Sequence, residues 1–165
     1  MTEISVRMGE LATSADPGTV LVSIGLGSCI GLALVDAAAG VAGLAHIMLP
    51  GPGEAASRPP ATFADTGVAA LLSGVLELGA RPARLAAAIV GGAQMFGNAV
   101  QLQVGARNEE AVRDALRAAR LRVAAADTGG STGRTIRVYV QDACVTSRAA
   151  GGSENALLGA QAVTA

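Results

Sequence analysis

Residues 17–35 contain no charged side chain. An uncharged run of this length could cross a membrane as a helix. Its middle, however, is Gly25-Leu26-Gly27-Ser28, a glycine-rich segment that is typical of a turn and unfavourable inside a helix. We therefore predict two strands, residues 19–24 and 29–35, joined by this turn, and no membrane insertion. The second strand is apolar at nearly every position, which indicates burial on both faces.

The rest of the chain adds further strands and two helices. A short reversal separates residues 29–35 from a strand at 41–48, so these two strands are expected to be antiparallel neighbours. The other predicted elements are a helix at 62–78, capped by Thr62, a helix to about residue 120, capped by Asn108, and strands at 85–90, 122–126, 135–141 and 143–148. The stretch 93–106 is ambiguous, although residues 100–104 alternate like a strand.

This order of elements favours a single-domain, layered α/β sandwich with a mixed, largely antiparallel sheet. The domain is expected to span residues 1–148. Residues 149–165 are small and weakly patterned, so we expect a flexible C-terminal tail there.

Composition narrows the class of function. Apolar residues make up 51% of the chain and aromatic residues 2%, so the core must consist mainly of Ala, Val, Leu and Ile. A net charge of -1 and the scarcity of stacking aromatics argue against nucleic-acid binding. Because Glu3, Arg7 and Glu10 interrupt the N-terminal segment, no signal peptide is predicted and a cytoplasmic location is expected.

Neither a metal nor a cofactor is expected. The chain has two cysteines and one histidine, and no two of them have the spacing of a structural zinc site. The glycine-rich segments 25–31 and 129–135 lack the glycine spacing of nucleotide-binding loops and the helix that should follow.

Cys29 and His46 are the candidate catalytic pair. His46 is the only histidine, and Cys29 lies at the glycine-rich turn. An imidazole can draw the proton from a thiol that attacks a carbonyl carbon. Adjacent strands would bring the two side chains together, and backbone N–H groups near Ser28 and Cys29 could stabilise the oxyanion. A structural role for both residues stays open, because free cysteines and lone histidines often only pack in a core, as we expect for Cys144.

Several short motifs occur together in this order: Leu26-Gly27-Ser28-Cys29, Ala45-His46-Ile47-Met48-Leu49-Pro50, Ala64-Asp65, Gly91-Gly92-Ala93-Gln94-Met95-Phe96, Gly105-Ala106-Arg107-Asn108 and Asp127-Thr128-Gly129-Gly130. Jointly they resemble the chemoreceptor glutamine deamidase family, the CheD proteins of chemotaxis. The resemblance implies an α/β sandwich that hydrolyses glutamine side chains on the cytoplasmic helices of chemoreceptors. It assigns the nucleophile to Cys29 and the histidine to His46. A third catalytic position, threonine in the family, falls on Ser23.

The resemblance implies a thioester mechanism without a cofactor, and glutamyl methyl esters could pass through the same thioester. It also implies a CheC-type phosphatase as a partner. Two other functions remain alternatives from the sequence: a non-catalytic regulatory module that docks on such a phosphatase, and another cysteine hydrolase, such as a peptidase or a transglutaminase-like enzyme.

Overall fold

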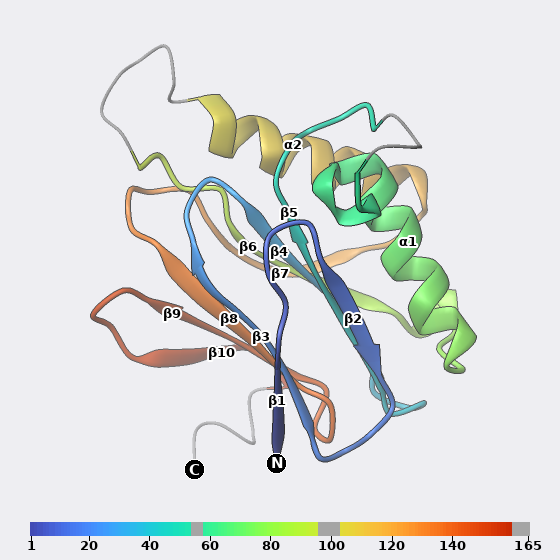
Figure 1. The fold of residues 1–165 in the computed structure, drawn as a ribbon. Coiled ribbons are helices and arrows are strands. Elements are labelled where there is room, and N and C mark those ends of the chain that lie inside the picture. The colour runs from blue at the N-terminus through green and yellow to red at the C-terminus, as the bar shows by residue number, and fades with distance from the viewer. Residues whose placement is uncertain (54–57, 96–102, 160–165) are drawn as a thin grey trace.

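Two five-stranded sheets and two helices form three layers in the computed structural model, which describes residues 1–53, 58–95 and 103–159 (Figure 1). One sheet has the order β1 (Thr2–Ser5), β3 (Thr19–Leu26), β8 (Arg134–Tyr139), β9 (Cys144–Ala149) and β10 (Glu154–Leu158). The other has the order β2 (Leu11–Ser14), β5 (Val41–Ile47), β4 (Ile30–Asp36), β6 (Ala86–Gly91) and β7 (Val123–Thr128). The helices are α1 (Ala64–Glu77) and α2 (Gln103–Ala118), with short 3-10 turns at Pro60–Thr62 and Pro82–Arg84.

Each sheet is mixed and largely antiparallel, which confirms the predicted fold class. Only β1–β3 and β6–β7 pair in parallel among the strand pairs of the described residues. The expected antiparallel pairing of β4 with β5 is also present.

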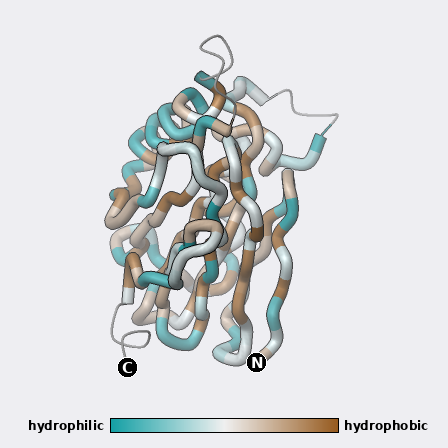
Figure 2. The backbone as a smooth tube through the Cα atoms, turned by 90° about the vertical axis from the view of Figure 1, so that its left-hand side faces the viewer, coloured by the Kyte–Doolittle hydropathy of each residue, from teal (hydrophilic) through white to brown (hydrophobic). Residues whose placement is uncertain are grey.

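The core has two parts because the β4–β5 sheet lies in the middle of the molecule. Leu32 and Leu34 face the helices, whereas Ala33 and Val35 face the other sheet. This arrangement explains why β4 is apolar on both faces. In Figure 2 hydrophobic stretches run along the strands, and hydrophilic residues gather in turns and on parts of the helices.

Helix α1 packs closely on β5, since a Cβ at Gly43 would stand 2.7 Å from Leu71 and 2.9 Å from Val75. In the part of the chain that the structure describes, no helix is long and apolar enough to cross a membrane.

Several predicted boundaries are wrong. Phe63 occupies the N-cap position of α1 without a side-chain hydrogen bond, and Thr62 belongs to the preceding 3-10 turn. Asn108 does not cap α2 but lies inside it, because the helix already includes Gln103. Of the ambiguous strand-like segment, residues 100–102 lie outside the described residues.

Regular structure also continues beyond residue 148, where the sequence predicted a flexible tail. Residues 154–158 form β10, whose backbone pairs antiparallel with β9. Small, weakly patterned side chains do not prevent this pairing, because a strand ladder is formed by the backbone. The short strands β1 and β2 were likewise not predicted.

Candidate active site

The turn that carries Cys29 connects the two sheets. Strand β3 ends at Leu26 in one sheet, and β4 begins at Ile30 in the other. The segment after β6 holds this turn: Ala93 N–H donates to Gly27 O, and Gly92 N–H donates to Cys29 O, both at 2.9 Å. Gly91 adopts φ 115°, and a Cβ there would overlap the carbonyl oxygen of Cys29. The Gly91-Gly92 pair therefore fixes the turn that carries Cys29.

Asn108 joins the Cys29 turn to the end of the His46 strand. It is fully buried in α2, and its Nδ2 donates to Ser28 O and to Met48 O, each at 2.9 Å. Its Oδ1 is buried, with no hydrogen-bond partner among the described residues. Asn108 belongs to the Gly105–Asn108 motif, but its sequence context predicted a helix cap instead. One amide thus ties together the two segments that carry the candidate catalytic side chains.

We expect Asn108→Ala to lower the free energy of unfolding by about 2 kcal/mol or more, because two buried carbonyls lose their donor. Urea denaturation followed by circular dichroism measures the change. Glu110→Ala, an exposed position on the same helix, is the matched control and should change stability by less than about 0.5 kcal/mol. Equal unfolding midpoints for the two variants would contradict the proposed role of Asn108 in linking the two segments.

His46 lies on the face of β5 that looks toward the other sheet. It is opposite Gly31 in the β4–β5 register, and a Cβ at Gly31 would meet Ile136 of β8 at 2.8 Å. Cys29 precedes Gly31 by two residues and packs against the same inter-sheet core. Diagonal neighbours of this kind are roughly 7–8 Å apart at their Cα atoms, within reach of a longer side chain. No hydrogen bond joins Cys29 to His46 in the residues that the structure describes.

A backbone carbonyl orients both His46 and Ser23. His46 Nδ1 lies 3.1 Å from Val6 O, and Ser23 Oγ donates to the same oxygen at 2.7 Å. Since a carbonyl only accepts, Nδ1 must carry the proton, and Nε2 is left as the basic nitrogen. Ser23 is buried and is linked to His46 only through Val6 O, not by a hydrogen bond of its own. No side-chain signal in the sequence could have revealed Val6.

The cavity beside His46 has a volume of about 350 Å³ and is lined by His46, Val6, Val22, Ile24 and residues 5, 7 and 8. Burial raises the pKa of the Cys29 thiol. Burial also lowers the pKa of His46, against the smaller opposing effects of Val6 O and of the Glu10 charge. Burial therefore favours the neutral form of both side chains near pH 7.

Cys144 is fully buried in β9, where burial and the charges of Asp142 and Glu154 raise the pKa of its thiol. This environment suits a packing residue rather than a nucleophile. No group of three or more His, Cys, Asp or Glu side chains that could hold a metal occurs within residues 1–53, 58–95 and 103–159.

Comparison with known proteins now adds to this geometry. Residues 48–149 match the family model described as CheD chemotactic sensory transduction. A probable chemoreceptor glutamine deamidase CheD of Symbiobacterium thermophilum is 40% identical over 158 residues, which cover 93% of this chain and 96% of the relative. The chain belongs to the CheD family. A CheD protein of Thermotoga maritima, named chemoreceptor glutamine deamidase, is 38% identical over 90% of this chain and 93% of its own length.

A further CheD relative, from Methanococcus vannielii, is 41% identical over 88% of this chain and 94% of its own length, and is named a probable chemoreceptor glutamine deamidase. These matches confirm the family resemblance that the motifs predicted. The family model begins at residue 48, after Cys29 and His46, whereas the three relatives cover 88–93% of this chain.

Proposed function

We propose that this CheD protein hydrolyses glutamine side chains of chemoreceptors to glutamate, with Cys29 as nucleophile and His46 as general base. The observation that carries the proposal is that Cys29 and His46 face the same space between the sheets. Cys29 lies in a turn held by three hydrogen bonds, and His46 lies in β5. The names of the CheD relatives supply the substrate.

In the first step Cys29 Sγ attacks the carboxamide carbon of the substrate while its proton passes to His46 Nε2. A tetrahedral intermediate forms, and its collapse breaks the C–N bond. The imidazolium returns the proton to the leaving nitrogen, so ammonia departs and a thioester remains. Water, deprotonated by His46, then attacks the thioester; glutamate is released and the Cys29 thiol is restored.

The turn is arranged to supply oxyanion donors. The carbonyl oxygens of Gly27, Ser28 and Cys29 all accept hydrogen bonds from the side of residues 92–93 and Asn108. In a trans peptide the N–H points opposite to the C=O of the same unit. The N–H groups of Ser28 and Cys29 are therefore directed away from that side, where they can donate to the developing negative charge.

Ser23 has a positioning role in this proposal. Its hydroxyl shares the Val6 carbonyl with His46 and so helps to fix the position of the oxygen that holds the imidazole. The threonine of the family would place a hydroxyl at the same position, whereas serine lacks the methyl group that restricts the rotamer.

The proposal is tested by incubating the protein with a chemoreceptor cytoplasmic fragment and mapping the products by mass spectrometry. Each converted glutamine gains the mass difference between a hydroxyl and an amino group, and ammonia appears in equal amount. An unchanged fragment would contradict the proposal. Binding of a CheC-type phosphatase without any conversion would favour the regulatory module instead.

A further inference from the structure

Exposed apolar side chains gather around the candidate active site. Met8 and Ile24 are 62% and 65% exposed, and both line the cavity beside His46. Met95 is 46% exposed and lies against the Cys29 turn, since a Cβ at Gly27 would stand 3.0 Å from Met95 Cγ. Single exposed apolar residues are ordinary, but three that flank one site are a distinct surface feature, which we call the apolar rim.

Ile24 lies on the outer face of β3, because successive side chains of a strand alternate, and a bulge lies next to it. The pairing of β3 with β8 shifts between Ser23 and Leu26, and Gly25 adopts φ 72°. Bulges of this kind re-aim side chains and are frequent next to active sites. Here Ser23 points inward to Val6 O while its neighbour Ile24 is exposed. The same local geometry thus builds the interior of the site and part of its apolar rim.

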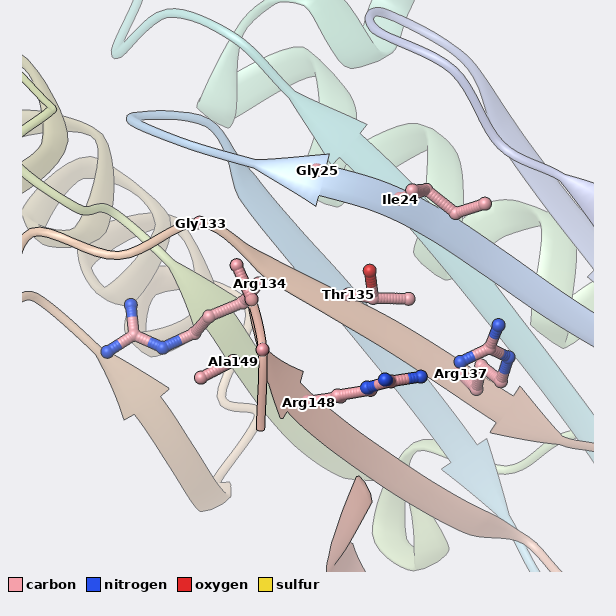
Figure 3. Close-up of a pocket in the computed structure, with 10 residues that line it drawn as sticks. Ile24, Gly25, Gly133, Arg134, Thr135, Arg137, Arg148 and Ala149 are labelled. Carbon is pink, nitrogen blue, oxygen red and sulfur yellow. The ribbon is translucent and has the colours of Figure 1, made fainter. Parts of the chain in front are cut away.

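A second cavity adjoins the apolar rim at Ile24. It has a volume of about 360 Å³ and lies on the outer face of the β3–β8–β9 sheet, where Thr135, Arg137 and Arg148 line it. Thr135 is directly opposite Arg148 in the β8–β9 register, so Arg137 and Arg148 are diagonal neighbours on one face. Figure 3 shows Ile24 at one edge of this cavity and the side chain of Arg148 extending toward Arg137.

The arginines of this cavity differ in what they already bind. Arg134 already has partners within the protein: it donates to Gly129 O at 2.7 Å and pairs with Asp127 at 3.3 Å, and its side chain is 11% exposed. Arg148 donates its Nε to Gly152 O at 2.8 Å and forms no salt bridge in the described part of the chain.

Arg137 pairs only loosely, at 3.5 Å, with the half-exposed Glu3. Glu154 is a further acid near this face; its carboxylate accepts hydrogen bonds from Tyr139 and Thr146, and the charges of Arg137 and Arg148 help to lower its pKa. Because a guanidinium has five N–H donors, Arg137 and Arg148 retain donors for a further carboxylate.

We propose that the apolar rim and the Arg137–Arg148 cavity together form the docking surface for an amphipathic, acidic helix that presents the target glutamine. This inference rests on the proposed function, because it names the form in which that substrate binds. Apolar side chains of the helix pack on Met8, Ile24 and Met95. A glutamate on the same helix binds at Arg137 and Arg148.

The position of the site favours a helix over an extended peptide. Cys29 immediately precedes β4, and His46 lies in β5; each of these strands has a neighbour on both sides. An extended peptide usually binds by adding to a free sheet edge, which neither strand offers. A helix needs only apolar contacts at spacings of three and four residues, and flexible methionines adapt well to such a surface.

The test measures binding and turnover separately. In an inactive Cys29→Ala background, Ile24→Ser should weaken binding of the receptor fragment by about tenfold or more, measured by calorimetry. Ile24→Met should restore most of the affinity. Leu78→Ser, at the end of α1 and 42% exposed, is the matched control and should bind like the parent. Equal affinities for Ile24→Ser and Leu78→Ser would overturn the apolar part of the proposal.

For the basic part, Arg148→Ala should weaken binding several-fold at low salt, and the difference should shrink at high salt. Arg117→Ala, whose side chain pairs with Asp114 on the surface of α2, is the control. Replacement of glutamates in the receptor fragment by uncharged residues should remove the difference between Arg148→Ala and its parent. A loss that is equal for Arg148→Ala and Arg117→Ala would overturn this part.

Failure of the proposed function would look different from failure of the docking surface. If the receptor fragment binds through Ile24 and Arg148 but no glutamine is converted, the catalytic proposal fails and the docking surface stands. If glutamine is converted and the KM of Ile24→Ser and Arg148→Ala matches that of their controls, the docking surface fails alone.

Discussion

Replacing Cys29 with alanine should abolish deamidation, lowering the rate by about 10⁴-fold or more, because the proposed thioester cannot form without the thiol. The fold is expected to survive. Cys29 is half-buried, and among the described residues its side chain makes no hydrogen bond, so alanine removes little beyond the sulfur. The rate of mass gain in a receptor fragment measures activity, and circular dichroism measures folding.

Cys144→Ala is the matched control for this experiment. Its thiol is buried in β9, which belongs to the other sheet from β4 and β5. The variant should therefore keep its deamidation rate within about twofold while losing some stability. Turnover by Cys29→Ala at a rate near that of the wild type, or loss of turnover in a folded Cys144→Ala protein, would mean that Cys29 is not the nucleophile.

Replacing His46 with glutamine should slow deamidation by about 10²–10⁴-fold, the usual contribution of a general base. Glutamine can still donate to Val6 O from its amide but offers no basic nitrogen. Ser23→Ala should have a smaller effect, because Val6 O keeps its bond to His46.

The pH profile separates a lost base from a merely structural defect. In the wild type, His46 must be unprotonated to act, and burial lowers its pKa. Activity should therefore persist into mildly acidic solution and fall only as the pH drops through that lowered pKa, below the ordinary value of about 6.5. His46→Gln should lack this acidic limb. A profile that is unchanged in shape would mean that His46 is not the base.

The β4–β5 pairing could be predicted because a short reversal between two apolar runs leaves little choice of topology. That pairing also placed Cys29 and His46 on neighbouring strands. The division into two sheets could not be predicted, since an apolar run shows that a strand is buried but not what covers each face. Asn108 was misread because asparagine is equally suited to capping a helix and to bridging two buried carbonyls.

The N-terminal segment is the largest part of the site that the sequence did not predict, and there is a physical reason why no side-chain pattern marks it. Strand β1 is exposed. The first group of this segment to contact the site is the main-chain oxygen of Val6, the residue after β1. The same segment holds the His46 backbone, through Gly9 N–H to His46 O and His46 N–H to Glu10 O, each at 2.9 Å. Figure 1 shows it crossing from β1 in one sheet to β2 in the other.

A contact made through a peptide carbonyl does not depend on which amino acid supplies it. The imidazole is therefore held by the path of the chain through residues 6–10, while the Val6 side chain packs in the inter-sheet core and Gly9 adopts φ 80°. A deletion or a one-residue insertion within this segment is expected to disconnect His46 and Ser23 from their common acceptor. The number of residues between β1 and β2 is therefore as much a part of this site as the side chains that line it.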